Sequence, residues 1–476
     1  MRIQFYTMKK YGCWFLFCLP LVSLSQSVSD RMAKAINSLE KDTQFKHAAI
    51  SIYVVESKTG KLVFDKNAEL GLVPASCQKV ITSAAAFELL GNNYRFKTEL
   101  GYDGEIKDST LNGNLYIVGY GDPTLGSWRW TNTKEEVILK KISAAITAAK
   151  IKKIEGNVFG YDRKWESNTT PGGWVWEDIG NYYGAGASAL NWRENQYDLI
   201  LKPGQKVGDA VTIAGMKPKL LDVGLYSEVT TGEKGSGDNA YIYLAPYSIY
   251  GFVRGSIPLS ENNFTISGAM SDPAGQLVNT IVEKLKEQNA EGILYAGSYN
   301  GIEVDKKNLP INPAIFFTHL SPSLDSINYW LLKKSINLYG EAFVKAIAYE
   351  KISFGSTEKG IELINSFWSK NGIEKSALNM KDGSGLSPSN RVTTKALVTV
   401  LQFAKQQKWF PSFYNALPEM NGIKMKDGYI GGVRSYTGYI KSKNGTEYTF
   451  AFIANNFDGS PATVREKMWQ VLNILK

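Results

Sequence analysis

The two ends of this chain carry elements that cannot bury their apolar faces by themselves. Residues 48–65 alternate apolar and polar side chains around a turn, and residues 75–90 form an alanine-rich apolar stretch between Pro74 and Gly91. These patterns predict a β-hairpin and a helix. An isolated hairpin is only marginally stable in water, so it needs further strands or a helix to pack against. Suitable partners follow residue 321, so the two ends of the chain must fold together.

The intervening tract, residues 94–310, consists of short alternating strands separated by Gly, Asn and Asp turns. We predict one α/β domain, formed by residues 26–93 and 311–476, that is interrupted by this β-rich insert of one or two subdomains. The predicted helices of the whole chain lie at 30–45, 75–90, 133–150, 275–289, 324–334, 337–349, 357–371, 394–407 and 463–475. Two predicted strands close the chain, at 433–442 and 448–455.

Composition excludes two broad classes of protein. The 476 residues are 43% hydrophobic and 12% aromatic, which is enough for a large core and two or three domains. Charged residues make up 21% of the chain, and neither a low-complexity tract nor a repeat of fixed period occurs. A disordered protein and a repeat solenoid are therefore excluded.

Residues 1–25 are typical of a cleaved signal peptide. Three basic residues within the first ten are followed by an apolar run over 11–22, and Ser23 and Ser25 are small residues at the −3 and −1 positions of a cleavage site before Gln26. A membrane anchor is the alternative, but an apolar run of about 12 residues is shorter than the roughly 20 that span a bilayer. We expect an exported protein of the periplasm or cell envelope, with no membrane span after cleavage.

The charge suits an anionic cell surface. Removal of the signal lowers the formal charge from +9 to +6, because three basic and no acidic residues leave. Nucleic-acid binding is not expected, because clusters of Lys and Arg interleaved with aromatic side chains do not occur.

Cysteine and histidine are too scarce for disulfides or metal centres. Cys13 and Cys18 leave with the signal, so Cys77 alone remains and no internal disulfide can form. His47 and His319 have no metal-binding spacing, so we do not predict a zinc site. A hydrolytic base other than histidine is expected.

Ser76 and Lys79 form the strongest candidate for a nucleophile and its base. Side chains three residues apart share one face of a helix, and the first turn of that helix adds free N–H groups that stabilise an oxyanion. Burial beside another cation would lower the pKa of Lys79, so that its neutral amine could deprotonate Ser76. The same spacing occurs at Ser38 and Ser356, but only Ser76 follows a proline at the start of an apolar helix. An ordinary helix serine beside a solvated lysine is the alternative.

The residues around Ser76 and further phrases along the chain favour a catalytic role for Ser76 and Lys79. Residues 74–79 (Pro-Ala-Ser-Cys-Gln-Lys) resemble the first motif of penicillin-interacting serine enzymes, whose set is Ser-x-x-Lys, Ser-x-Asn and Lys-Thr-Gly. Further phrases at 119–125, 187–195 and 382–387 resemble the D-alanyl-D-alanine carboxypeptidase/endopeptidase family, the class C low-molecular-mass penicillin-binding proteins. The resemblance covers nearly the whole mature chain. It implies a DD-peptidase/β-lactamase-like transpeptidase domain, in which an antiparallel sheet is flanked by helices.

The resemblance assigns the second motif to Ser335, which falls between two predicted helices, and Asn337. In this role Ser335 would relay a proton toward the leaving amine, and Asn337 would hold the substrate amide and Lys79. The alternative for Ser335 is an N-cap of the helix that follows.

The resemblance assigns the third motif to Lys426, Asp427 and Gly428. Lys426 would attract the terminal carboxylate of the substrate, Gly428 would let its backbone approach, and the N–H groups of Tyr429 and Ser76 would form the oxyanion hole. The literal Lys-Thr-Gly at residues 58–60 precedes the nucleophile and is expected to be a hairpin turn.

Asp427 departs from the family pattern, which has a hydroxyl at this position. Two carboxylates about 4 Å apart repel by roughly 4 kcal/mol at an effective dielectric of 20. Turnover of a free D-Ala terminus should therefore suffer unless Asp427 turns away, pairs with Arg434 or is protonated.

Cys77 is a second possible nucleophile, but it points about 100° away from Ser76 around a helix and is expected to be core packing.

The resemblance implies a serine DD-peptidase that cleaves D-Ala-D-Ala termini, D-Ala-diaminopimelate cross-links, or both, through an acyl-enzyme on Ser76. Its partners would be peptidoglycan stem peptides and β-lactams, and no cofactor is implied. Two alternatives stay open, a peptidoglycan-binding pseudoenzyme impaired by Asp427, and an esterase or D-amidase with the same Ser–Lys pair. The sequence leaves the oligomeric state open.

Overall fold

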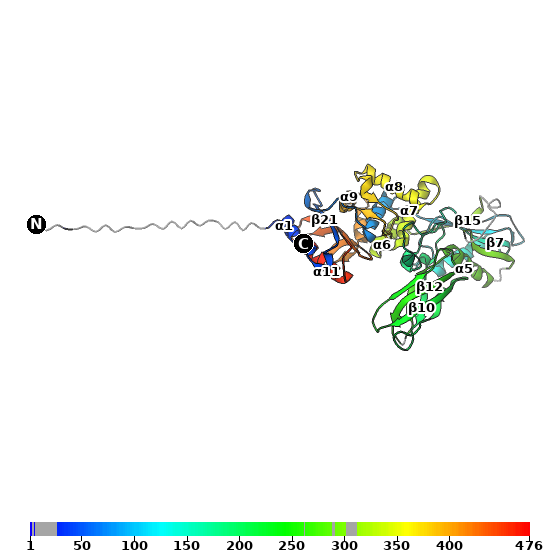
Figure 1. Cartoon of the computed structure of the whole chain (residues 1–476). Coiled ribbons are helices and arrows are strands. Elements are labelled where there is room, and N and C mark those ends of the chain that lie inside the picture. The colour runs from blue at the N-terminus through cyan, green and yellow to red at the C-terminus, as the bar shows by residue number, and fades with distance from the viewer. Residues whose placement is uncertain (2–3, 5–25, 261, 288–290, 301–311) are drawn as a thin grey trace.

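The computed structural model describes residues 1, 4, 26–260, 262–287, 291–300 and 312–476 (Figure 1). The predicted signal peptide and the predicted domain boundary at residue 310 therefore lie outside the described residues, positions 1 and 4 excepted. No helix in the described ranges has the length and apolar character needed to cross a membrane.

The two ends of the chain share one six-stranded antiparallel sheet, as the sequence predicts. Its strand order is β18-β19-β20-β21-β1-β2, and Ala49 near the start of the chain pairs with Asn455 near its end. The hairpin turn between β1 and β2 contains residues 58–60, with Gly60 in the left-handed region at φ 71°. The literal Lys-Thr-Gly sequence therefore forms a turn and is not the third motif of the site. The strands of this sheet are β1 (Ala49–Glu56), β2 (Leu62–Lys66), β18 (Glu419–Met420), β19 (Ile423–Ile430), β20 (Val433–Lys441) and β21 (Glu447–Asn455).

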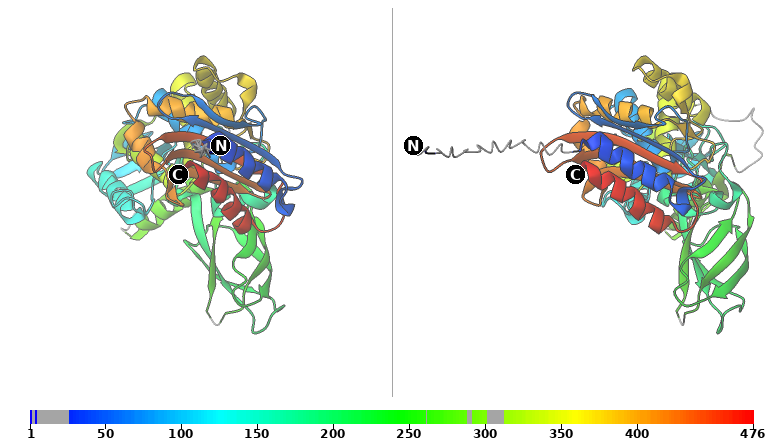
Figure 2. Two further views of the ribbon diagram at one scale, coloured as in Figure 1. Left: turned by 90° about the vertical axis from the view of Figure 1, so that its left-hand side faces the viewer. Right: turned by 60° about the vertical axis from the view of Figure 1, so that its left-hand side comes forward.

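Helices cover both faces of the sheet because its central strands are apolar on both sides. In β21, Phe450 and Phe452 point to one face, whereas Ala451 and Ile453 point to the other. The first face is covered by α1 (Val28–Glu40) and α11 (Pro461–Leu472), the blue and red helices of Figure 2. On the side of the second face, α9 (Thr394–Lys405) packs on β1, β20 and β21. The other helices that share its apolar core are α2 (Lys79–Leu89), α6 (Leu324–Lys333), α7 (Asn337–Ile352), α8 (Thr357–Lys370) and α10 (Phe410–Ala416).

The α2 helix lies at the centre of the second layer. Every residue from Lys79 to Phe87 is buried, and α2 contacts α6, α7, α8 and α9. The elements that the sequence did not predict in this region include α10 and β19. The α10 helix is short, and β19 lacks a clear alternation because it carries Lys424, Lys426 and Asp427.

The middle of the chain builds its own sheets, as predicted. A seven-stranded sheet has the order β15-β3-β6-β7-β5-β4, with β14 beside β7, and α3 (Glu135–Ala148) and α5 (Pro273–Glu287) share its apolar core. Its strands are β3 (Lys97–Tyr102), β4 (Glu105–Lys107), β5 (Thr110–Asn112), β6 (Leu115–Gly119), β7 (Lys153–Tyr161), β14 (Ile293–Ser298) and β15 (Ala314–Leu320). The strand β15 begins after residue 310 and pairs with β3, so this sheet extends beyond the predicted end of the insert.

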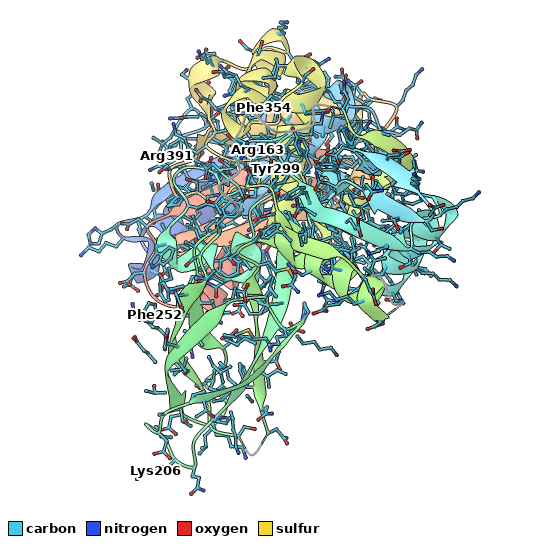
Figure 3. All side chains as sticks on the ribbon, turned by 90° about the vertical axis from the view of Figure 1, so that its right-hand side faces the viewer. Arg163, Lys206, Phe252, Tyr299, Phe354 and Arg391 are labelled. Atoms are coloured by element: carbon cyan, nitrogen blue, oxygen red, sulfur yellow. The ribbon has the colours of Figure 1, made fainter. Side chains whose placement is uncertain are left out.

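Two three-stranded sheets, β10-β12-β11 and β13-β8-β9, share a further core and form the lobe that projects below the body in Figure 1. Lys206 lies at the outer end of this lobe, whereas Arg163 and Tyr299 lie together in the body, with the guanidinium 4.7 Å from the ring centroid (Figure 3). The strands are β8 (Gln196–Lys202), β9 (Thr212–Lys217), β10 (Gly224–Gly232), β11 (Asn239–Tyr243), β12 (Tyr250–Pro258) and β13 (Phe264–Ala269). The remaining short elements are α4 (Trp176–Ile179), β16 (Leu378–Asn379) and β17 (Arg391–Val392).

Candidate active site

Ser76 lies in a tight turn at the start of α2. The turn is the 3₁₀ helix η2 (Ala75–Gln78), and Ala75 in front of Ser76 has a left-handed φ of 45°. Between Leu72 and Phe87 every residue is buried except Ser76, which is partly exposed. A left-handed alanine costs roughly 1–2 kcal/mol, and such strain is held only where the surroundings fix the backbone. The turn therefore presents one hydroxyl to solvent from an otherwise closed core.

Lys79 contacts Ser76 from inside the protein. Its Nζ donates hydrogen bonds to Ser76 Oγ at 2.9 Å, to Asn337 Oδ1 at 2.6 Å and to the carbonyl of Ser384 at 2.7 Å. Burial, followed by the positive charge of Lys426, lowers the pKa of Lys79 from 10.5 to about 7. A substantial fraction of the neutral amine is thus present at neutral pH, beside the hydroxyl that it would deprotonate.

Two buried acids oppose this lowering of the Lys79 pKa. Asp382 and Glu341 both favour the charged form of Lys79. Glu341 accepts hydrogen bonds from the backbone N–H groups of Gly383 at 2.9 Å and Ser384 at 2.8 Å, while burial and then the charge of Asp382 raise its own pKa. These bonds hold the loop whose Ser384 carbonyl accepts from Lys79.

Asp382 fixes the other end of this loop. Its carboxylate accepts from Gln78 Nε2 at 2.9 Å, from the N–H of Ser387 at 2.6 Å and from Trp174 Nε1 at 2.9 Å. Gln78 belongs to the nucleophile turn and Trp174 belongs to the middle of the chain. One buried carboxylate thus links the turn, the loop and the insert.

Ser335 and Asn337 enter from the start of α7. Ser335 is partly exposed, with a left-handed φ of 58°, and the N-cap of α7 is Ile336, with no side-chain capping bond. The N-cap alternative for Ser335 is therefore wrong. Asn337 donates through Nδ2 to the carbonyl of Tyr183 at 2.7 Å while accepting from Lys79, so it bridges Lys79 and the insert. Within the described residues, no direct hydrogen bond joins Ser335 to Lys79.

Strand β19 lies directly against the nucleophile turn. The Sγ of Cys77 donates to the carbonyl of Lys426 at 3.2 Å, and the hydroxyl of Ser435 on β20 donates to the carbonyl of Pro74 at 2.6 Å. A Cβ placed on Gly428 would lie 2.9 Å from the backbone nitrogen of Ser76 and 2.7 Å from the carbonyl oxygen of Pro74. Only glycine allows this approach, which brings Lys426 and Asp427 to the same region as Ser76.

Asp427 forms an ion pair with its neighbour Lys426. The Nζ of Lys426 donates to Asp427 Oδ1 at 3.0 Å and to the Asp427 carbonyl at 2.7 Å, and the Lys426 side chain is only 1% exposed. Although burial opposes ionisation, the charge and hydrogen bond of Lys426, together with the charge of Arg434, lower the pKa of Asp427. The sequence predicts efficient turnover of a free D-Ala terminus only if Asp427 turns away, pairs with Arg434 or is protonated. Instead, the carboxylate stays ionised and pairs chiefly with Lys426. Arg434 donates through Nε to Tyr436 Oη at 2.9 Å.

Cys77 is core packing, as predicted. The side chain is fully buried, and burial raises the pKa of its thiol to about 12. A neutral, enclosed thiol is a poor nucleophile, so Ser76 is the better candidate.

Sequence reasoning missed the acids and carbonyls that surround Lys79. Glu341, Asp382, Ser384 and Tyr183 received no role, although residues 382–387 supplied one of the phrases that carried the resemblance. The dense Gly and Ser content of that phrase was the available signal, because a tight loop with many backbone N–H groups suits a buried carboxylate.

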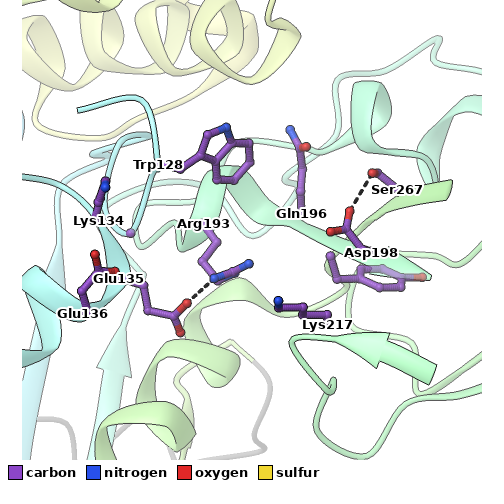
Figure 4. Close-up of a pocket in the computed structure, with 11 residues that line it drawn as sticks. Trp128, Lys134, Glu135, Glu136, Arg193, Gln196, Asp198, Lys217 and Ser267 are labelled. Atoms are coloured by element: carbon purple, nitrogen blue, oxygen red, sulfur yellow. Dashed lines mark hydrogen bonds and ion pairs between the residues drawn. The ribbon is translucent and has the colours of Figure 1, made fainter. Parts of the chain in front are cut away.

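A cavity of about 490 Å³ lies elsewhere, between α3 and the β8 and β9 strands (Figure 4). An Arg193–Glu135 ion pair and a 2.9 Å hydrogen bond from Ser267 to Asp198 lie along its wall. None of the predicted site residues lines it. In the described ranges, no group of three or more His, Cys, Asp or Glu side chains is arranged to hold a metal ion.

Comparisons with known proteins agree with the fold and place the chain in a family. The model of the D-Ala-D-Ala carboxypeptidase 3 (S13) family matches residues 32–475. A D-alanyl-D-alanine carboxypeptidase of Actinomadura is 26% identical over 472 residues, covering 90% of this chain and 82% of the relative. The D-alanyl-D-alanine carboxypeptidase DacB of Haemophilus influenzae is 24% identical over 420 residues, covering 83% of each.

A solved structure confirms the predicted fold class. Penicillin binding protein 4 from Haemophilus influenzae superposes with a TM-score of 0.78 at 20% identity, covering 94% of this chain and 99% of that chain. At this identity the likeness establishes the shared architecture, an antiparallel sheet flanked by helices with strand-rich segments between its two parts.

Proposed function

Because the chain belongs to the D-Ala-D-Ala carboxypeptidase 3 (S13) family, we propose that it is a serine DD-peptidase of peptidoglycan whose nucleophile is Ser76. One observation carries the proposal. The only partly exposed residue of the 72–87 segment is a serine whose Oγ lies 2.9 Å from the Nζ of Lys79, a buried lysine with a pKa of about 7. A base needs this proximity and a pKa near the working pH.

The reaction would be acyl transfer. Neutral Lys79 takes the Ser76 proton, Ser76 Oγ attacks the carbonyl of the penultimate D-Ala, and the C–N bond breaks as the amine of the terminal residue leaves. Ser335, whose hydroxyl is partly exposed, would pass a proton to that amine. Water then hydrolyses the ester and restores Ser76. A D-Ala-diaminopimelate cross-link would be cut by the same steps.

The tetrahedral intermediate needs donors for its oxyanion. The backbone N–H of Ser76 at the start of α2 and that of Tyr429 on β19 are the proposed pair, and the close contact of Gly428 with the turn supports it. One such donor contributes about 3 kcal/mol to the transition state. Asn337, held by Tyr183, would orient the substrate amide.

Residues 1–25 would direct export to the periplasm or envelope, where the substrate lies. Stem peptides and β-lactams would be the partners, because a β-lactam presents an acylating carbonyl to the same serine. We propose residues 26–93 and 311–476 as the catalytic domain, with residues 94–310 as the insert.

Labelling with benzylpenicillin tests the proposal. Intact-mass spectrometry of the protein should show one added penicilloyl group, and peptide mapping should locate it on Ser76. The Ser76→Ala variant should show none, whereas Ser83→Ala, on the same helix but bonded to Asn328, should be labelled normally. An adduct that persists in Ser76→Ala refutes Ser76 as the nucleophile.

A second candidate is a pseudoenzyme that binds peptidoglycan without turnover. It is favoured by the ionised Asp427 carboxylate, which stands where a terminal carboxylate would bind. Binding of purified peptidoglycan without release of D-Ala, and without an acyl-enzyme, would support it. An esterase or D-amidase is the third candidate, and it predicts faster turnover of D-amino-acid esters or amides than of any stem peptide.

A further inference from the structure

We infer that this site is built for a peptide whose leaving residue ends in a carboxamide instead of a free carboxylate. The Lys426–Asp427 pair carries the inference, because it presents a cation and an anion side by side next to the nucleophile turn. The inference rests on the proposed function, since it concerns the group that occupies the same site during acyl transfer.

The geometry makes the pair accessible on one side only. Lys426 is 1% exposed and uses two hydrogen bonds on Asp427, at 2.7 Å and 3.0 Å, whereas the Asp427 side chain is 33% exposed. An arriving end group therefore meets the Asp427 carboxylate at the surface, while the Lys426 ammonium lies enclosed beneath it. The positive charge of Lys426 is already matched by that carboxylate, on which the charge of Arg434 also acts.

Three end groups can be compared by their hydrogen-bonding capacity. A carboxylate has only acceptors, so it can receive a bond from Lys426 but is repelled by Asp427. An ammonium group has only donors, so it suits Asp427 but is repelled by Lys426. A carboxamide has two donor hydrogens for the exposed Asp427 carboxylate and an acceptor oxygen that can face the neighbouring cations Lys426 and Arg434. It is the only one of the three that satisfies both partners without a net charge.

The chemistry of the acyl transfer is unchanged by this end group. Ser76 Oγ forms the ester bond to the penultimate D-Ala carbonyl, the C–N bond to the last residue breaks, and the amine of that residue takes a proton. The carboxamide leaves intact as part of an amino-acid amide, and water hydrolyses the ester. Release of ammonia would instead mean attack on the carboxamide itself.

Two peptides that differ only at their end group test the inference. Diacetyl-L-Lys-D-Ala-D-Ala and its C-terminal amide are turned over separately by the full mature protein, and the products are identified by mass spectrometry. We expect kcat/KM to favour the carboxamide by about 100-fold or more, with D-alaninamide as the released product. We expect both Asp427→Thr and the isosteric Asp427→Asn to lose the carboxamide preference, because each replaces the anion with a neutral donor.

The possible outcomes separate the two proposals. A preference for the free carboxylate, or equal turnover of the two peptides, overturns the inference while leaving the proposed function standing. Release of ammonia from the amide also overturns it. Failure of both peptides to acylate Ser76 overturns the proposed function and the inference with it. Because the wild-type ratio alone decides, a variant that fails to fold does not block the test.

Discussion

Gly428 is the position where one methyl group should damage the site most. In Gly428→Ala the added Cβ would lie 2.4 Å from Ser435 Oγ, 2.7 Å from the Pro74 carbonyl oxygen and 2.9 Å from the Ser76 nitrogen. Two of these three atoms belong to the backbone and cannot move as a flexible side chain can. The strand and the nucleophile turn must therefore separate.

The size of the effect follows from this separation. Overpacking of a well-packed region costs about 1–3 kcal/mol of folding stability. Displacement of the Ser76 N–H from the oxyanion position should cost about as much as the loss of one donor, a 10²–10³-fold slower reaction. We expect the melting temperature to fall by a few degrees and acylation by a fluorescent penicillin to slow by about 100-fold.

A matched variant separates the local clash from a general effect of alanine. Gly431, in the turn between β19 and β20, has no atom within 4 Å of an added Cβ and no left-handed φ. Gly431→Ala should therefore acylate and melt like the wild type. Stopped-flow fluorescence gives the acylation rate, and thermal unfolding reports stability in the same samples. If Gly428→Ala acylates at the wild-type rate, the contact between β19 and the turn has no part in the reaction.

Three further predictions follow from buried groups. The lowered pKa of Lys79 is about 7, and only the neutral amine accepts a proton. The acylation rate should therefore rise about tenfold per pH unit below pH 7 and level off above it. A flat profile from about pH 5 to 9 would exclude Lys79 as the base. Glu194 is fully buried and accepts hydrogen bonds from Ser127, Arg129 and Tyr339. In denaturant unfolding, Glu194→Ala should lower the free energy of unfolding of the protein by about 3–5 kcal/mol. The control Glu228→Ala, at an exposed ion pair, should lower it by at most about 1 kcal/mol. Cys77 in protein that begins at residue 26 should resist thiol reagents until the chain unfolds, because it is fully buried, and rapid labelling of the native protein would contradict this.

Sequence alone predicted most helices and the four strands β1, β2, β20 and β21, because their signals are local. The i, i+3 spacing of Ser76 and Lys79 fixes their shared face, and the turn residues at 58–60 excluded the literal Lys-Thr-Gly from the site. Strand β19 was not predicted, because residues 424–427 are mostly charged and their alternation is masked. Its place beside η2 depends on pairing with β20, which sequence periodicity does not encode.

The sequence determined which reactive side chains are available. It also determined where the chain must turn, because turns depend on residues a few positions apart. Tertiary structure decided the charge states of the reactive side chains. Lys79 is poised near pH 7 because folding buries it, with Lys426 lowering its pKa and the distant Glu341 and Asp382 raising it. Asp427 stays ionised because the fold holds Lys426 against it and keeps both partly or wholly out of water. The balance at Lys79 depends on residues far apart in the chain, and the balance at Asp427 depends on how deeply the fold buries two adjacent side chains; no local pattern contains either.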